Sequence, residues 1–174
     1  NWTMVKQYPY LVGDFMWAAW DYLGECSLGA WTDEEDGLAF NKPYPWKLAD
    51  EGAFDLLGNP TGEALWAAAV WRNKTSIGVR PVRSVDNTLA KGAWRGTNAI
   101  PSWSWSGCEG KEAIVEVYTQ GKTVILFLNG EQVGFSDTTD MRAIFTIIYQ
   151  PGQIEAVAYD ENGRECGRSS LSSA

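Results

Sequence analysis

Histidine is absent from this 174-residue sequence, and its absence restricts the chemistry that the chain can perform. Without imidazole there is no Ser/His/Asp or Cys/His triad and no zinc site with histidine ligands. Cysteine is also scarce, and Cys26, Cys108 and Cys166 fit neither a disulfide framework nor a CxxC metal motif. We therefore expect no metal and no cofactor. Three widely spaced cysteines slightly favour a reducing compartment, which would be the cytoplasm.

Positive charge and long apolar runs are also in short supply. The 14 Lys and Arg residues are outnumbered by 22 Asp and Glu residues, which gives a net charge of −8. Nucleic-acid binding needs clustered Lys and Arg, so we expect no nucleic-acid partner. No apolar run reaches the roughly 18 residues of a membrane-spanning helix, so we expect no membrane partner. The acidic run at 33–36 is interpreted as a solvated loop rather than a metal site.

Tryptophan is what the sequence has in excess, with ten residues. The indole offers a flat apolar face and one N–H donor. Sugar rings present flat C–H faces edged by hydroxyls, so an abundance of tryptophan suits a carbohydrate partner. We expect one or two of the ten at a sugar site and the others in packing roles. The ten are Trp2, Trp17, Trp20, Trp31, Trp46, Trp66, Trp71, Trp94, Trp103 and Trp105.

The first half of the chain has few regular elements. It begins Asn1-Trp2 rather than with methionine, so we expect an internal piece of a longer protein. Residues 2–7 predict the end of a helix, and the apolar run at 11–19 predicts a strand buried on both faces. Residues 21–57 predict a long loop, which is unusual unless it is functional. One strand and one helix cannot bury their own apolar surface, so this half should be the last β/α unit of a larger body.

A helix is predicted after this loop. Asn59 suits the N-cap position and Pro60 the first helical position. The helix is expected to end near Arg72, and residues 77–82 then predict a short strand or linker. Its predicted apolar face consists of Leu65, Ala68, Ala69 and Trp71.

Strand patterns fill the second half. Asn129-Gly130 is the strongest two-residue hairpin signal, and residues 150–153 place Pro and Gly at the centre of a type II turn. Short strands at this spacing predict an immunoglobulin-like sandwich. A last strand is expected to start near Leu171. The other predicted strands are 113–119, 123–128, 131–136, 143–149 and 154–159.

Motifs in both halves match one known family. They lie at 10–25 (YLVGDFMWAAWDYLGE), 27–31, 44–46, 54–60, 103–105, 109–111, 115–119, 126–130, 149–152 and 156–159. Together they resemble glycoside hydrolase family 2, the β-galactosidase family, from the last strand of its barrel into the domain that follows. The resemblance implies a mixed fold. Residues 1–80 would be the C-terminal part of a (β/α)8 (TIM) barrel, 81–101 a linker and 102–174 an immunoglobulin-like β-sandwich.

The resemblance also implies an activity and the place of its residues. Family members are retaining glycosidases with two catalytic glutamates. These lie on the fourth and seventh barrel strands, before the segment that begins here, so no catalytic residue is expected in this chain. Trp17 matches the tryptophan at the end of the eighth strand, which implies a wall of the sugar site. Packing in the barrel core is the alternative for Trp17. Asp21 and Glu25 are interpreted as groups that hydrogen-bond within the loop rather than as a catalytic pair.

Three hypotheses follow for the function. The first is a fragment of a β-galactosidase-like hydrolase of O-glycosidic bonds, inactive alone, which supplies one sugar-site wall and a structural sandwich. The second is a carbohydrate-binding module, which needs an exposed row of aromatic residues on one sheet face. The third is a purely structural or interaction domain, which we prefer for residues 102–174. The sugar stays open, because Ala18-Ala19 and Thr61 depart from the Thr-Gly and Lys that are frequent in the family.

The predicted strand at 11–19 has a physical consequence. It and the helix after it should lack most of their barrel partners in this chain. An unpaired strand edge and a large apolar patch promote association. We therefore expect the isolated chain to self-associate, or to pack this segment against its own sandwich.

Overall fold

The computed structural model of the chain describes residues 2–25, 28–29, 32–33, 44–84, 89–90 and 95–174. The helix at 2–7 confirms the prediction for that segment. In these ranges the elements are α1 (Trp2–Gln7), β1 (Thr32–Asp33), α2 (Gly62–Arg72), β2 (Ser76–Val79), β3 (Leu89–Ala90), β4 (Glu112–Tyr118), β5 (Thr123–Leu128), β6 (Glu131–Asp137), β7 (Arg142–Ile148), β8 (Gln153–Tyr159) and β9 (Glu165–Ser172).

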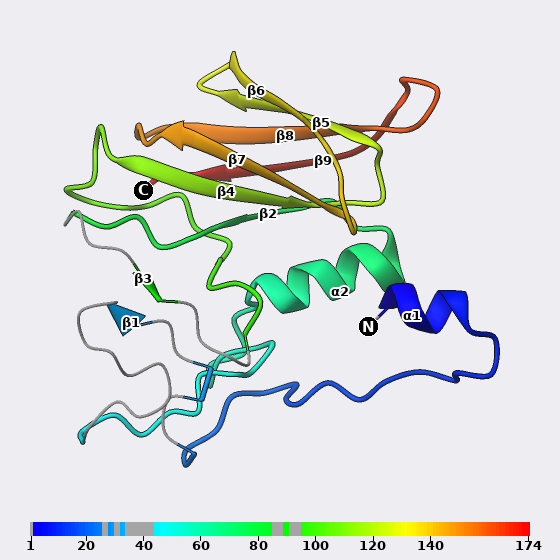
Figure 1. Cartoon of the computed structure of the whole chain (residues 1–174). Helices are drawn as coiled ribbons and strands as arrows, with labels where there is room; N and C mark the ends of the chain where they lie inside the picture. Colours follow the sequence, from blue (N-terminus) through cyan, green and yellow to red (C-terminus); the bar gives the residue numbers. More distant parts are fainter. Residues whose placement is uncertain (1, 26–27, 30–31, 34–43, 85–88, 91–94) are drawn as a thin grey trace.

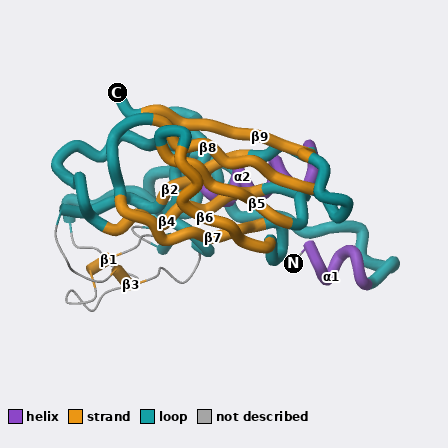
Figure 2. The backbone as a smooth tube through the Cα atoms, turned by 90° about the horizontal axis from the view of Figure 1, so that it is seen from above, coloured by secondary structure: helices purple, strands orange, loops and turns teal. Residues whose placement is uncertain are grey.

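Two antiparallel sheets form a β-sandwich, as predicted. One sheet has the order β2-β4-β7 and the other the order β6-β5-β8-β9. In Figure 1 the sandwich forms the upper part of the molecule, and α2 lies below the three-stranded sheet. Figure 2 shows that the strands of both sheets run in roughly the same direction, which is the aligned way of packing two sheets.

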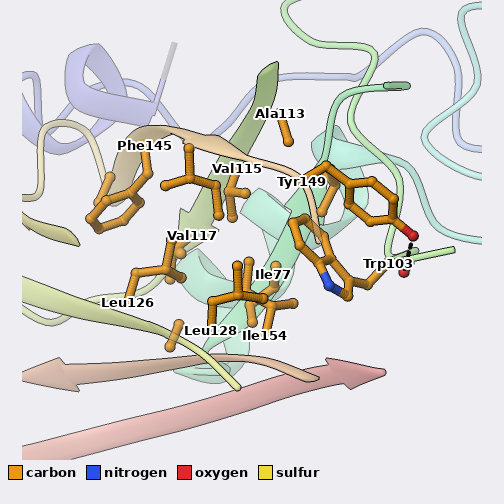
Figure 3. Packing of buried hydrophobic residues seen from close by; sticks show 14 of the residues in the cluster. Ile77, Trp103, Ala113, Val115, Val117, Leu126, Leu128, Phe145, Tyr149 and Ile154 are labelled. Atoms are coloured by element: carbon orange, nitrogen blue, oxygen red, sulfur yellow. Dashed lines mark hydrogen bonds between the residues drawn. The ribbon is translucent and has the colours of Figure 1, made fainter. Parts of the chain in front are cut away.

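The core lies between the two sheets and is built by strands that alternate inward and outward. Residues Val124, Leu126 and Leu128 of β5 face inward, and so do Val115 and Val117 of β4. Figure 3 shows Val115, Val117, Leu126 and Leu128 in the same interior as Phe145 of β7 and Ile154 of β8. A continuous apolar interior of this kind follows from period-2 patterning in each strand.

One end of this core is closed by an aromatic pair. Trp103 is 1% exposed, and its ring meets that of Tyr149 at a centroid distance of 4.9 Å (Figure 3). The Trp103 indole N–H donates to the carbonyl of Gln150 at 3.1 Å. The buried donor is therefore satisfied, and this tryptophan has a packing role.

The hairpin predicted at Asn129-Gly130 is confirmed. Both residues have positive φ, at 52° and 84°, as a type I′ turn requires, and they join the antiparallel pair β5 and β6. The last strand, β9, begins at Glu165 rather than near Leu171. Its side chains are exposed or half-buried, so backbone pairing with β8 defines this strand and hydrophobic patterning could not reveal it.

The apolar run at 11–19 forms no strand, so the prediction of a strand buried on both faces is wrong for this chain. Val12 and Phe15 are fully exposed. A strand needs a hydrogen-bonded neighbour on at least one edge. Within the described ranges, no sheet includes a strand beside this run. The segment is therefore an extended arm that passes below α2 (Figure 1).

α2 begins two residues later than predicted, with Thr61 as its N-cap residue. The Asn59 side chain donates instead to the Asp55 carboxylate at 2.8 Å, and Pro60 pairs with Phe54 in an isolated bridge. The Asn-Pro pair thus closes a turn before the helix. A polar side chain that can cap a helix can equally bond a nearby carboxylate, and here Asn59 bonds Asp55 instead of capping α2.

The end of α2 at Arg72 agrees with the prediction, but its buried face is narrower than predicted. Leu65 and Ala69 are buried against Tyr118 of β4. Trp71 is 69% exposed, so its place on the predicted apolar face is wrong. Its ring contacts Trp2 of α1 at a centroid distance of 4.6 Å, which ties the two helices together.

β2 belongs to the sandwich although it precedes residue 80, where the sequence places the end of the barrel part. Ser76–Val79 pairs with Val115–Tyr118 of β4 over four residues. All four β2 residues are buried: Ile77 and Val79 belong to the sandwich core, whereas Gly78 faces α2 and Ala99 on the other side of the sheet. The link between α2 and the sandwich is therefore a strand and not a flexible connection.

Candidate functional site

Trp17 lies on the surface, next to a cluster of polar side chains. Its side chain is 73% exposed, so in this chain it does not pack in a core. Its indole N–H donates to the Tyr22 hydroxyl at 3.0 Å, and the two rings are perpendicular, with centroids 6.3 Å apart. The N–H is thus occupied within the protein. What Trp17 offers to a ligand is the apolar face of its ring.

Two carboxylates meet at the Tyr22 hydroxyl. It contacts the carboxylates of Glu25 and Glu51, the latter at 2.8 Å. The hydrogen bond to Glu25 is the largest of the effects that raise the pKa of Tyr22 to about 12. The phenol therefore stays protonated at neutral pH. It has one hydrogen, so it can donate to only one of the two carboxylates at a time.

Asp21 and Glu25 form hydrogen bonds within the loop, as predicted. Asp21 is 8% exposed, and its carboxylate accepts the backbone N–H of Asp50 at 2.9 Å. Glu25 contacts Tyr22. The two residues thus bind different partners and do not face a common ligand position as a pair.

A cleft of about 290 Å³ separates Trp17 from the sandwich. Its lining includes Trp17 on one side, Trp66 of α2, and Asp140 and Arg142 on the sandwich side. The Trp66 indole N–H donates to the carbonyl of Asp140 at 2.8 Å and fixes that rim. The cleft therefore combines aromatic surface with carboxylate and guanidinium groups, a composition that suits a polar ligand with apolar faces.

A buried carboxylate lies behind this cleft, and the sequence reasoning missed it. Glu116 is 0% exposed in the middle of β4. It accepts hydrogen bonds from Tyr118 at 2.6 Å and Thr97 at 3.0 Å, both through hydroxyl groups. Arg80 and Arg142 complete the cluster at 2.7 and 3.2 Å. The missed signal was a charged residue between Val115 and Val117, in the middle of a strand and flanked on both sides by apolar residues.

The cluster keeps Glu116 ionised. Burial alone would raise the pKa of Glu116, but the hydrogen bonds from Tyr118 and Arg80 and the charges of Arg80 and Arg142 outweigh it. The net effect is a pKa below the ordinary value of 4.5. Burial and the Glu116 charge raise the pKa of Tyr118, which therefore stays a donor. At neutral pH the cluster is therefore a charged link between strands and does not behave as an acid–base pair.

Some predicted features lie outside the described residues. They are Cys26, Trp31, Trp94 and the acidic residues 34–36. In the part of the chain that is described, Cys108 is buried and Cys166 is exposed, and both are free thiols. Over the same residues, no group of three or more His, Cys, Asp and Glu is placed to hold a metal ion. No helix among them has the length and apolarity to span a membrane.

Known proteins are similar to this chain along nearly its whole length. A solved glycosyl hydrolase family 2 member from Bacteroides cellulosilyticus matches 99% of the chain with 32% identity and a TM-score of 0.81. A Formosa agariphila protein provisionally named a β-glucuronidase is 28% identical over 99% of the chain. The β-galactosidase BoGH2A of Bacteroides ovatus is 22% identical over 95% of the chain.

The match covers only part of each relative. This chain spans 23% of the solved protein, 14% of the Formosa protein and 15% of the Bacteroides ovatus protein. A family model described as a domain of unknown function, DUF4982, matches residues 110–167, which are strands of the sandwich. The resemblance that the sequence predicts is therefore confirmed: this chain is similar over nearly its whole length to one segment of glycoside hydrolase family 2 proteins.

Proposed function

We propose that this chain is a segment of a retaining, β-galactosidase-like glycoside hydrolase, in which Trp17 forms one wall of the sugar site. The observation that carries the proposal is the exposed ring of Trp17, whose N–H is held by Tyr22. A ring fixed in this way can stack on the apolar face of a sugar at little cost in side-chain entropy. Relatives with names for β-galactoside and β-glucuronide cleavage support a glycoside as the ligand.

The segment is proposed to be inactive alone, with the catalytic carboxylates elsewhere in the whole protein. Retaining hydrolysis needs two carboxyl groups about 5 Å apart with the glycosidic bond between them. Glu25 and Glu51 lie close together, but the Tyr22 hydroxyl contacts both and fills the space between them. Hydrolysis of nitrophenyl galactosides by the purified chain would contradict this part of the proposal.

We propose the domain plan that the resemblance implies. Residues 1–80 are the C-terminal part of a (β/α)8 barrel whose other strands lie outside this chain, and 102–174 are an immunoglobulin-like sandwich. Two observations support this plan: no strand of the described part of the chain pairs with the extended arm at 11–19, and α2 follows the arm after a long stretch of chain. The sandwich has the role of bracing the barrel.

A carbohydrate-binding module is the weaker alternative. Such a module needs several aromatic rings in a row on an exposed sheet face. Among the described sandwich strands, Phe135 is exposed, whereas Tyr118 is buried against α2. The 490 Å³ groove between β6 and β7 is lined by aliphatic and polar residues such as Val133 and Ile148. Titration calorimetry of the chain with galactosides tests this alternative, because a module would bind the sugar and release or absorb heat until its sites are saturated.

The sugar-wall proposal is tested in the full-length protein by replacing Trp17. Loss of one aromatic contact worth about 1.5 kcal/mol predicts a roughly tenfold lower kcat/KM for Trp17→Ala. The kcat/KM of Trp17→Phe should lie between those of Trp17→Ala and the original enzyme. The matched control is Trp71→Ala, which removes a similarly exposed tryptophan on α2. Equal kcat/KM values for Trp17→Ala and the original enzyme would refute the proposal that Trp17 forms a wall of the sugar site.

A further inference from the structure

We propose that Thr97 is a positioning residue for the Trp17 wall, through a chain of hydrogen bonds that starts at the buried Glu116. The proposal rests on the proposed function, because it explains how the sandwich holds a sugar-site residue from behind. It gives the sandwich a role in substrate binding that a passive spacer would not have.

The first step joins the sandwich to residues 97–99. The Thr97 hydroxyl donates to the Glu116 carboxylate at 3.0 Å and accepts the backbone N–H of Ala99 at 3.0 Å. Thr97 and Ala99 are 4% and 0% exposed, so water cannot replace either bond. One hydroxyl thus fixes the position of Ala99 relative to β4.

The second step joins residues 97–99 to the start of α2. The carbonyl of Ala99 accepts the N–H of Gly62 at 2.8 Å. The contact is close, since a Cβ atom on Gly62 would lie 2.3 Å from the Thr97 methyl group and 2.5 Å from the Tyr118 hydroxyl oxygen. Glu63, the next helix residue, accepts the backbone N–H of Gly96 at 3.0 Å. The first turn of α2 is thus held against the Thr97 segment.

The third step leads from α2 to Trp17. The backbone N–H of Thr61 donates to the carbonyl of Ala53 at 2.8 Å. The N–H of Ala53 in turn donates to the carbonyl of Ala18 at 2.9 Å, and that of Phe54 donates to Ala19 at 2.9 Å. Ala18 is the residue bonded to Trp17. These two bonds anchor the arm just beyond the fully exposed stretch that contains Val12 and Phe15.

The side chain at position 97 must both donate and accept for the chain of bonds to be complete. Thr97→Val has nearly the same shape but offers neither a donor nor an acceptor, so it leaves the Ala99 N–H without its partner. Thr97→Ser keeps both functions. Comparing the two variants therefore distinguishes the effect of losing the hydroxyl group from the effect of changing the side-chain volume.

The first measurement is amide hydrogen exchange of the purified chain. We expect Thr97→Val to speed exchange at Ala53 and Phe54 by about tenfold relative to Tyr149, whose N–H bonds to Lys111 in the sandwich. Thr97→Ser should leave that ratio unchanged. The Tyr149 reference keeps the test valid if the variant is less stable overall, because global unfolding accelerates all three amides together. An unchanged ratio in Thr97→Val overturns the proposal.

The second measurement is KM and kcat in the full-length protein. Thr97→Val should raise KM about fivefold with a smaller change in kcat, because a misplaced wall weakens substrate binding. Thr75→Val is the control: it removes another buried threonine hydroxyl, bonded to Thr119 at 2.9 Å, outside this chain of bonds. An increase in KM in Thr75→Val as large as that in Thr97→Val would overturn the positioning role of Thr97.

The two proposals fail in distinguishable ways. If Trp17→Ala leaves KM unchanged while Thr97→Val still alters exchange at Ala53 and Phe54, the sugar wall is wrong and the structural link stands. If Trp17→Ala raises KM and Thr97→Val changes neither exchange nor KM, the wall stands and the positioning role is wrong.

Discussion

Tryptophan residues of this chain have different roles, and burial separates them. Trp103 is 1% exposed and closes the sandwich core, whereas Trp17 is 73% exposed and presents a ring face to solvent. Trp66 is half-buried and uses its N–H to hold the rim of the cleft at Asp140. The number of tryptophans therefore indicates carbohydrate only through those few that remain exposed.

Replacing Glu116 by glutamine should destabilise the chain by about 2–4 kcal/mol. The amide has the shape of the carboxylate but no charge, so Arg80 and Arg142 lose their ion pair inside the protein. Urea unfolding measures the loss. The control is Arg168→Gln, which breaks surface ion pairs with Glu155 and Glu165 and should cost less than about 1 kcal/mol. Equal losses in the two variants would show that the buried cluster is not stabilising.

The same residue gives the stability a pH dependence. The folded-state pKa of Glu116 lies below 4.5, so the folded form binds the proton less tightly than the unfolded form does. The stability from the ionised group is therefore complete above that ordinary value, and it is lost as the pH falls through the lower folded-state pKa. The free energy of unfolding should thus fall less steeply with decreasing pH below about 4.5 in Glu116→Gln than in the original chain.

At the scale of elements, α2 depends on its first residue for its position on β4. Gly62 lies against Thr97 and Tyr118, and one added methyl group would overlap both. Gly62→Ala should therefore destabilise the chain by about 1–3 kcal/mol, although alanine favours helix. Thermal unfolding measures the change. Gly96→Ala is the control, since its added carbon would meet only the Glu63 carboxylate at 3.9 Å, and it should be nearly neutral.

Strands of the sandwich differ in how visible they are in the sequence. β5 was predicted with its observed bounds, Thr123–Leu128, because this segment is rich in β-branched and apolar residues. β9 carries no fully buried side chain, and its polar sequence contains no such apolar run. β2 was predicted only as a short strand or linker, because its four residues cannot show which sheet will accept them.

At the scale of the whole molecule, a well-packed sandwich is joined to an arm with exposed apolar side chains. Val12 and Phe15 are fully exposed, and Leu11 and Met16 lie beside them, 36% and 55% exposed. Several large apolar side chains exposed within one short segment are unusual for a monomer in solution. In the proposed full-length protein the other barrel strands would cover it.

The isolated chain should therefore self-associate at micromolar concentration. Light scattering after size-exclusion chromatography measures the molar mass, and the double variant Val12→Ser/Phe15→Ser should shift it toward that of the monomer. Ile148→Ser is the control, because it removes an exposed apolar residue from β7 of the sandwich. A larger shift with Ile148→Ser than with the arm variant would place the contact on the sandwich instead.

The sequence by itself determined strands β4 to β8, the Asn129-Gly130 hairpin and the likeness to glycoside hydrolase family 2, because these depend on neighbouring residues and local motifs. Only the tertiary structure decided which residues meet. Glu116 finds Arg80, Thr97 and Arg142 from segments far apart in the chain. Among the described residues, no strand pairs with the arm at 11–19, and the arm is not a strand because ladder partners, and not the apolar pattern alone, make one.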